Sequence, residues 1–258
     1  MKFEHYYSEK PTQDGFPIHL HKNIFEWYFC INGKGEYFVE GHRYVLEPGT
    51  TMLIRPGELH YPEIDTDHVY ERCFVYFSEE MAKSIDEKLL HPFTGRPFGH
   101  GNYIGPDKID TSLIKSCIAK MDENTDSSLG MQCYFYPVLY ETYRAFSAAE
   151  ESLPRVDALI AEIMEYINQN LHEDLSLDNI EKRFYINKTS LNQRFKKVTG
   201  KTIGSYILDH RLMQAIHLLR AGEAAVKTAH ICGFADYSSF YRAFIKKFKI
   251  SPGKITPE

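Results

Sequence analysis

The sequence predicts a multidomain α+β chain: an N-terminal β-barrel with a helical hairpin, then an all-α domain with two helix-turn-helix units. Three observations predict this fold class. Short runs rich in Tyr, Phe, Val and Ile alternate with Gly and Pro turns before residue 78, helical periodicity follows from residue 109, and two similar basic helices lie near the C-terminus. We therefore expect the barrel over residues 1–106, the hairpin over 107–150 and the all-α domain over 151–258.

The N-terminal strands are expected to be short and evenly spaced. Four turns that contain Gly separate them, at residues 32–35, 40–41, 47–49 and 55–57. This spacing is typical of a β-sandwich or a small barrel. Residues 82–106 are less regular, and we assign no strand or helix to them. The expected strands cover residues 24–31, 35–39, 43–46, 51–54 and 69–77.

Two apolar stripes at helical spacing come next. One runs from Ile109 to Met121 and the other from Tyr134 to Phe146, with a polar turn between them, so we expect a helical hairpin. The hairpin either only covers the barrel or also joins two chains in a homodimer through its outer face, and the residues leave both open. Glu150–Pro154 breaks the periodicity and is the expected linker.

The C-terminal residues indicate a series of helices with recognisable ends. Gly200 is the expected stop of one helix, and Thr202 and Asp236 are the expected N-caps of two others. Ser251 and Pro252 are expected to start a final helical turn. The expected helices cover residues 156–170, 177–184, 187–199, 203–219, 224–231 and 236–248.

The third and the last of these helices share one pattern. Leu191 and Phe195 fall on one face of the first, and Phe240 and Phe244 on one face of the second. The opposite faces carry small polar residues, an Arg and paired Lys, which suits a DNA groove. The helix between them, of about 17 residues, would be about 25 Å long. With its turns, it approaches the roughly 34 Å between successive major grooves, so one chain could reach both.

The charge is divided along the chain. Residues 1–154 carry 14 Lys and Arg against 24 Asp and Glu, whereas residues 155–258 carry 16 against 11. A basic C-terminal part is typical of a module that binds a polyanion. Five cysteines without a CxxC pair argue against a disulfide framework or a structural zinc site. No apolar run is long enough for a signal peptide or a bilayer span, so we expect a cytoplasmic protein without membrane contact.

Several spaced segments of the C-terminal part match a known pattern. They are Leu191–Lys197, Thr199–Thr202, Gly233–Phe234, Ser238–Phe244 and Ile250–Pro252. Together they resemble the DNA-binding domain of the AraC/XylS family over roughly residues 155–255. The resemblance implies a transcriptional regulator that binds double-stranded operator DNA and a small-molecule effector, and that could also contact RNA polymerase.

By position in this motif, six residues are the expected base-reading side chains, because Asn and Gln can pair with adenine and Arg with guanine. They are Thr189, Asn192, Gln193, Ser238, Tyr241 and Arg242. Five lysines are expected to meet DNA phosphate, which holds the protein in position without reading sequence. They are Lys188, Lys196, Lys197, Lys246 and Lys247.

A second constellation lies in the expected barrel. His19 and His21 would point to the same side of a strand, and Glu26 and His60 follow. Over about residues 15–77 this spacing resembles the two cupin motifs, so the resemblance implies a cupin-like barrel in which the four side chains converge. They could hold a divalent transition metal, bind a small polar effector through hydrogen bonds, or be satisfied within the barrel without a ligand.

Further residues could line the same pocket. If Glu26 points inward, Tyr28 does too, because the two share one strand face. Tyr37, Arg43 and Tyr61 are weaker candidates. The many tyrosines would suit a sugar or another polyhydroxylated effector, and a barrel that is merely rich in aromatic residues explains them equally well.

The favoured function is a sequence-specific, DNA-binding transcriptional regulator whose cupin-like domain senses a small polar metabolite, such as a sugar, and which is not an enzyme. The alternative is a metal-dependent cupin enzyme, such as an isomerase or dioxygenase, fused to a DNA-binding domain. Beyond the four candidate ligands, we identify no separate set of general acids or bases. A third hypothesis is a regulator whose N-terminal domain is purely structural.

Overall fold

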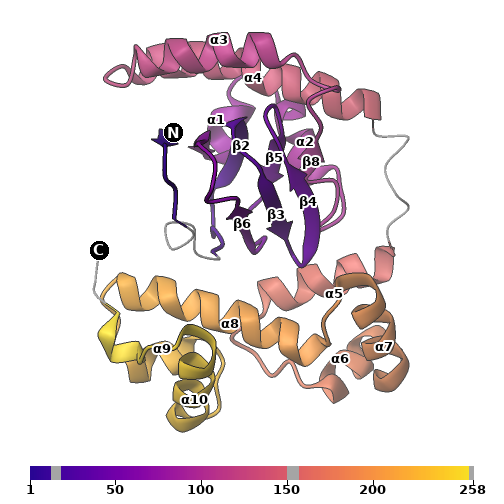
Figure 1. The fold of residues 1–258 in the computed structure, drawn as a ribbon. Helices are drawn as coiled ribbons and strands as arrows, with labels where there is room; N and C mark the ends of the chain where they lie inside the picture. Colours follow the sequence, from indigo (N-terminus) through magenta and orange to yellow (C-terminus); the bar gives the residue numbers. More distant parts are fainter. Residues whose placement is uncertain (13–18, 150–156, 256–258) are drawn as a thin grey trace. The chain divides into compact units, whose positions relative to one another are not determined.

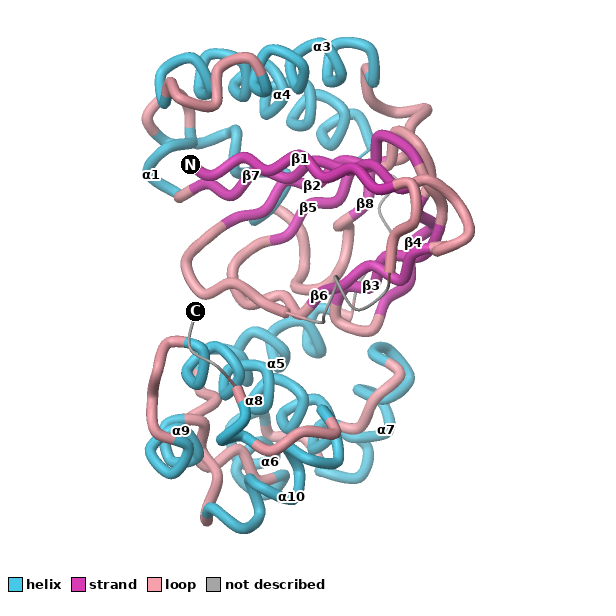
Figure 2. Tube along the Cα trace, turned by 60° about the vertical axis from the view of Figure 1, so that its left-hand side comes forward, coloured by secondary structure: helices cyan, strands magenta, loops and turns pink. Residues whose placement is uncertain are grey.

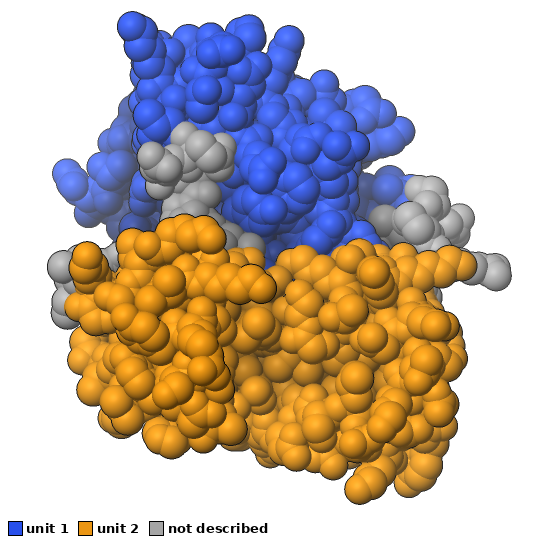
Figure 3. Space-filling model, turned by 60° about the horizontal axis from the view of Figure 1, so that its bottom comes forward, with its two compact units in different colours: residues 1–156 blue, residues 157–258 orange. Residues whose placement is uncertain are grey.

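The computed structural model describes residues 1–12, 19–149 and 157–255. The chain divides into two compact units, Met1–Val156 and Asp157–Glu258, which Figure 3 shows in two colours. Unit 1 combines β-sheets with helices, and the described part of unit 2 is built from helices (Figure 1). This confirms the predicted α+β fold class. The expected linker, Glu150–Pro154, lies outside the described residues, as does the first residue of the helix expected at 156–170.

Unit 1 contains two antiparallel sheets that face each other (Figure 2). The larger sheet has the strand order β1-β7-β2-β5-β8, and the smaller has the order β4-β3-β6. The strands are β1 (Lys2–Ser8), β2 (Phe25–Asn32), β3 (Gly35–Val39), β4 (His42–Leu46), β5 (Thr51–Ile54), β6 (His60–Ile64), β7 (Tyr70–Phe77) and β8 (Tyr103–Ile104).

Strands β1, β6 and β8 were not predicted, because each has a weak local signal. Strand β6 has the sequence HYPEI, whose Pro62 suits only an edge position, and β6 is indeed at the edge of its sheet. The segment after β7, where we predicted little regular structure, contains short helices as well as β8. These are α1 (Glu79–Lys83), the 3-10 helix η2 (Glu87–Leu90) and α2 (His91–Thr94).

Strand β2 shows how the larger sheet separates two environments. Its residues from Phe25 to Cys30 are all buried, so both of its faces are covered. Trp27 and Phe29 belong to an apolar cluster with the helices, whereas Tyr28 and Cys30 belong to a second cluster between the two sheets. The alternation of side chains along a strand explains this division.

The helical hairpin consists of α3 (Thr111–Asp122) and α4 (Ser128–Ala149) and covers the outer face of the larger sheet (Figures 1 and 2). Helix α4 begins six residues before the predicted start at Tyr134. The buried Trp27 indole donates a hydrogen bond of 3.0 Å to the hydroxyl of Thr142 on α4, which ties the hairpin to the sheet. No helix in the described part of the chain is long and apolar enough to cross a bilayer.

The helices of unit 2 begin and end largely where local signals predict. Thr202 and Asp236 accept hydrogen bonds from backbone N–H groups at the starts of their helices, and Gly200 ends a helix in the left-handed conformation, with φ of 75°. Ser251 makes no side-chain cap, and the final turn is a short 3-10 helix. The helices are α5 (Ala158–Gln169), α6 (Leu177–Phe184), α7 (Lys188–Thr199), α8 (Ile203–Arg220), α9 (Ala225–Ile231), α10 (Tyr237–Phe248) and the 3-10 helix η4 (Pro252–Lys254).

Candidate functional site

Helices α7 and α10 are each anchored on one side only. Leu191 and Phe195 of α7 and Phe240 and Phe244 of α10 have no exposed surface. Phe240 and Phe244 pack in one cluster with residues of α8 such as Leu212. Each helix is therefore held by its apolar face, and the opposite face is available to a ligand.

The exposed face of α7 retains two of the three base-reading candidates. Thr189 and Gln193 are exposed, whereas Asn192 is half-buried. The Asn192 side-chain oxygen accepts a hydrogen bond of 2.9 Å from the backbone N–H of Ile203, at the start of α8. This bond uses one of the two lone pairs of the amide oxygen and holds the Asn192 side chain against the start of α8, so its contact with adenine stays a prediction.

All three candidates of α10 are exposed: Ser238, Tyr241 and Arg242. One Arg242 nitrogen lies 3.4 Å from the hydroxyl of Ser239, a long contact that leaves most of the guanidinium donors available. Asp236 caps the helix and accepts hydrogen bonds from Ser239. The start of α10 therefore presents short polar side chains and one arginine.

The five lysines expected at phosphate fall into two groups. Lys196, Lys197 and Lys246 are exposed. Lys188 and Lys247 are exposed as well, but each forms an ion pair within the chain, Lys188 with Asp178 at 2.5 Å and Lys247 with Asp209 at 2.8 Å. Their contact with DNA phosphate stays a prediction. The acidic partners lie 10 and 38 residues away in the sequence, which is why helical periodicity did not reveal them.

The second candidate site lies in unit 1, where His19, His21, Glu26 and His60 converge. One potential ligand atom from each residue lies within 4.8 Å of the others. Glu26 Oε2 is 2.9 Å from His21 Nε2, 3.0 Å from His60 Nε2 and 3.9 Å from His19 Nε2. Glu26 and His60 are buried, whereas the side chains of His19 and His21 are 25% and 15% exposed, so solvent reaches the cluster from the His19 side.

The hydrogen bonds of His60 determine which of its nitrogens carries a proton. Its Nδ1 lies 2.8 Å from the backbone carbonyl of Glu58, which can only accept, so Nδ1 must donate. Burial, together with the neighbouring His19, lowers the pKa of His60 to about 4, so the ring is neutral at pH 7. The lone pair of Nε2 then faces the Glu26 carboxylate at 3.0 Å, so these two groups offer adjacent donor atoms to a hydrogen-bond donor or a cation.

The cluster also fits the metal that a cupin-like barrel could hold. Imidazole nitrogens and carboxylate oxygens bind zinc at about 2.0–2.2 Å, so neighbouring donors around one ion lie roughly 3 Å apart. The 2.9 and 3.0 Å separations at Glu26 match this spacing. The carbonyl of Glu58 would supply the outer hydrogen bond that orients a ligating histidine.

Tyrosines surround the cluster between the sheets. The hydroxyl oxygens of Tyr28 and Tyr70 lie 2.6 Å apart. The ring of Tyr37 stacks on that of His60 with the ring centroids 6.3 Å apart, and the ring centroid of Tyr76 lies 4.6 Å from that of His21. Burial raises the pKa of each of these phenols, so they remain neutral hydrogen-bonding groups. The ring of Tyr28 lies 4.9 Å from that of Tyr37, so Tyr28 is linked to His60 through Tyr37, and its place in an effector pocket stays a prediction.

Two of the weaker pocket candidates lie on the other face of the smaller sheet. Arg43 is exposed and pairs with Glu36 at 2.8 Å, and Tyr61 stacks on Phe38 at 4.9 Å. Arg43 and Tyr61 are both paired across from Phe38 in the sheet register, whereas Tyr37 has the opposite orientation. The prediction that Arg43 and Tyr61 line the pocket was wrong, because it did not include this register.

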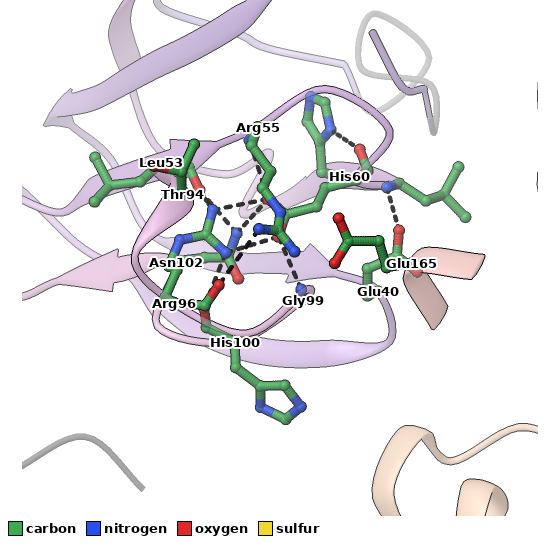
Figure 4. A network of polar contacts seen from close by, with 12 residues as sticks. Glu40, Leu53, Arg55, His60, Thr94, Arg96, Gly99, His100, Asn102 and Glu165 are labelled. Atoms are coloured by element: carbon green, nitrogen blue, oxygen red, sulfur yellow. Dashed lines mark hydrogen bonds and ion pairs between the residues drawn. The ribbon is translucent and has the colours of Figure 1, made fainter. Parts of the chain in front are cut away.

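A buried polar network holds the turn that carries His60. The Glu58 carboxylate accepts hydrogen bonds from both terminal nitrogens of Arg96, at 2.7 and 2.8 Å, from Gly99 N and from the Asn102 amide. Figure 4 shows Arg96, Gly99 and Asn102 close together in this network, with dashed lines marking the hydrogen bonds. Sequence reasoning missed the network, because Arg96 and Asn102 lie 38 and 44 residues from Glu58 and in a segment without periodicity. Its effect is to fix the backbone carbonyl that orients His60.

Comparisons with known proteins match one domain in each unit of the chain. The model of the AraC-like ligand binding domain matches residues 4–136, and that of a helix-turn-helix domain matches residues 180–256. The HTH-type transcriptional activator RhaS of Enterobacter sp. (strain 638) is 25% identical over 249 residues, which cover 94% of this chain and 88% of that protein. RhaS of Escherichia coli (strain K12 / DH10B) is 24% identical over 255 residues, with the same coverage.

Among solved structures, ToxT from Vibrio cholerae O395 has a similar fold over the whole chain. It is 14% identical, with a TM-score of 0.52 and coverage of 98% of this chain and 95% of ToxT. ToxT bound to (E)-4-(8-methylnaphthalen-1-yl)but-3-enoic acid gives a TM-score of 0.53 at 13% identity, with coverage of 98% and 97%. Because the ligand-binding domain model alone matches more than half of the residues, this chain belongs to the AraC/XylS family of transcriptional regulators, with an N-terminal AraC-like ligand-binding domain and a C-terminal helix-turn-helix DNA-binding domain.

Proposed function

We propose that the chain reads an operator with α7 and α10 in successive major grooves and that a small polar effector in unit 1 controls this binding. The observation that carries the proposal is the pair of helices, each buried on one side and polar on the other, at the two ends of α8. Thr189, Gln193, Ser238, Tyr241 and Arg242 are the proposed base-reading residues, and their exposure supports this role. The bond of Asn192 to α8 leads us to give it a structural role.

Arg242→Ala and Lys196→Ala should weaken DNA binding in different ways. Arg242→Ala should cost about 1–3 kcal/mol of discrimination at one base pair of the selected operator. Lys196→Ala should instead weaken binding to all sequences and reduce the dependence of log K on log salt by about one unit. Fluorescence anisotropy on selected and random duplexes at several salt concentrations measures both. An equal loss on both duplexes for Arg242→Ala would remove its base-reading role.

We propose that the effector binds at the cluster of His19, His21, Glu26 and His60. The partly exposed His19 and His21 would meet the ligand first, and the ring of Tyr37 stacks on His60 of the same cluster. Neutral phenols, imidazoles and a carboxylate are groups that hydrogen-bond hydroxyls, so a sugar or a related polyhydroxylated metabolite is the proposed effector class. The match to an AraC-like ligand binding domain over residues 4–136 supports a ligand in unit 1.

A homodimer is part of this proposal. The outer face of the hairpin exposes Leu113 on α3 and Leu129 and Tyr140 on α4, the last two at 74% and 61%. Apolar side chains exposed on one element favour an interface with a second copy. Sedimentation velocity of the complete chain, compared with a Leu129→Asp variant, tests this assembly.

A divalent transition metal is the second candidate ligand, because the lone pair of His60 Nε2 and the carboxylate of Glu26 face each other. His19, His21, Glu26 and His60 would hold it. A bound metal would supply a Lewis-acidic attachment point for an oxygen donor of the effector. The chain's own residues would orient that donor and shield it from water.

A thermal-shift screen distinguishes the two candidates. Chelator-treated protein is heated with sugars and related metabolites, with and without Zn²⁺ or Ni²⁺, because a ligand at 100 times its Kd adds about 2.7 kcal/mol of apparent stability. The shift should disappear in Glu26→Gln and His60→Ala and remain in His68→Ala, whose side chain is exposed beside Asp65. A shift with metal alone supports the metal, and a shift with a sugar alone supports direct binding. A shift that survives Glu26→Gln would place the ligand elsewhere.

A further inference from the structure

Asp209 on α8 makes two ion pairs to different parts of unit 2. Its Oδ2 lies 2.7 Å from Lys201 Nζ, and its Oδ1 lies 2.8 Å from Lys247 Nζ. The Asp209 side chain is only 13% exposed. Burial alone would raise its pKa, but the hydrogen bonds and charges of the two lysines outweigh burial and lower the pKa, so Asp209 is ionised. These hydrogen bonds are partly buried, and charge-assisted hydrogen bonds are directional and stronger than neutral ones.

The two lysines come from the two helix-turn-helix units. Lys201 follows Gly200 in the turn that leads out of α7, and Lys247 lies in the last turn of α10. Asp209 itself lies in the first half of α8, the helix that separates the units. The carboxylate of Asp209, on α8, therefore connects the turn after α7 with the last turn of α10.

The other contacts that hold α10 are mainly apolar. Phe240 and Phe244 pack against Leu212, Ala215 and Leu219 of α8. Apolar packing resists separation of the helices, but it is not directional and restrains a small rotation only weakly. A pair of short ion pairs at the far end of α10 adds the missing restraint, because both oxygens of one carboxylate are occupied.

We propose that Asp209 is a positioning residue that sets the relative placement of α7 and α10, and therefore the operator spacing that the chain accepts. This inference rests on the proposed function, in which both helices read DNA. The centres of successive major grooves lie about 34 Å apart, and one additional base pair displaces the second groove by about 3.4 Å and also rotates it. A rigid connection rejects such an operator, whereas a loose one tolerates it.

Lys247 then has a different role from its neighbour Lys246: it positions α10 and does not contact phosphate. Lys246 and Lys247 are adjacent on α10, and a sequence pattern treats them alike. Both lysines are exposed, but the ammonium of Lys247 is bound to Asp209. Lys246→Met should therefore weaken binding to every duplex and lower the salt dependence. Lys247→Met should leave the salt dependence unchanged and relax the spacing requirement.

The experiment uses the complete chain and operators selected by the unmodified protein from a random duplex pool. Affinities are measured for the selected duplex and for versions with one base pair inserted or removed between the two contacted segments. Asp209→Asn, Lys201→Met and Lys247→Met should each reduce the discrimination between these spacings by roughly tenfold, the size expected for a hydrogen bond to a charged group. A double variant should add little, because the three residues form one unit. Glu223→Gln, which breaks an exposed pair with Lys227, is the matched control.

Each outcome decides the question. Loss of spacing discrimination in the three variants, with the control unchanged, supports the inference. An equal loss of affinity for all spacings means that Asp209 only stabilises the fold, and it overturns the inference. An unchanged spacing profile, or a lower salt dependence in Lys247→Met, also overturns it. If the unmodified chain selects no sequence, the proposed function itself fails, which is a separate result.

Discussion

Replacing Arg96 by methionine should lower the free energy of unfolding of unit 1 by about 3–5 kcal/mol, because it removes the bidentate charge partner of the buried Glu58 carboxylate and leaves only Arg55, whose Nε is 3.8 Å away. Neither side chain has exposed surface, and two hydrogen bonds of 2.7 and 2.8 Å join them. Urea denaturation followed by the fluorescence of Trp27 measures the loss. This residue is the only tryptophan of the chain, and it is buried in unit 1.

The pH dependence of Arg96→Met should be opposite to that of the unmodified protein. In the unmodified protein, burial alone would raise the pKa of Glu58, but Arg96 and Arg55 hold it below its ordinary value. Because the folded pKa is depressed, the stabilisation is present above the unfolded pKa, about 4.3, and is lost as the pH falls through the folded pKa. In Arg96→Met, burial shifts the pKa of Glu58 upward, so the Glu58 carboxyl group of the folded variant binds a proton more tightly than that of the unmodified protein. The deficit of the variant should therefore shrink as the pH is lowered from 7 towards 5.

Two controls separate charge loss from general disruption. Arg43→Met breaks the exposed pair with Glu36 and should leave the unfolding curve nearly unchanged. The double variant of Arg96→Met with Glu58→Gln should recover part of the stability, because no unpaired charge remains. If Arg96→Met costs no more than Arg43→Met, the network does not support the turn that carries His60.

Truncation of Phe244 to alanine should lower the free energy of unfolding of unit 2 by about 3–5 kcal/mol. Its side chain has no exposed surface, and its ring lies 5.4 Å from Phe240 and 4.7 Å from Phe248. The cavity would remove the contact that seats α10 on α8, so binding to DNA should also be lost. Denaturation followed by circular dichroism at 222 nm detects the helical unit, whereas the fluorescence of Trp27 should not change.

The control for this variant is Val226→Ala on α9, which removes an apolar side chain that is 55% exposed. It should have little effect on stability or on DNA binding. Equal losses in Phe244→Ala and Val226→Ala would mean that α10 is not held by its apolar face. A simultaneous change in the fluorescence of Trp27 would mean that the two units do not unfold separately.

The helices of unit 2 were predictable because their signals are local. The hydroxyl of Thr202 accepts a hydrogen bond from the backbone N–H of Ser205, only three residues away, and Gly200 adopts the left-handed conformation directly after α7 ends. Strand β6 was not predictable in this way, because its five residues, HYPEI, include a proline and two polar side chains, and because it pairs with distant residues: with β3 and, at His60, with His19. The arrangement of His21, Glu26 and His60 required the resemblance to a known barrel, since a pairing between residues 34 positions apart has no local signal.

The sequence by itself determined the α+β class and the two helix-turn-helix units, and its resemblance to a known barrel identified the four residues that converge at Glu26. Hydrophobic periodicity, caps and turns act over a few residues, so they are visible without a structure. Only the tertiary structure decided which polar groups remain available. Asn192 and Lys247 occupy positions that suit DNA contact, but α8 binds both of them through Ile203 and Asp209. The physical reason is that a hydrogen bond or an ion pair depends on distance in space, and folding brings together charges that periodicity cannot relate.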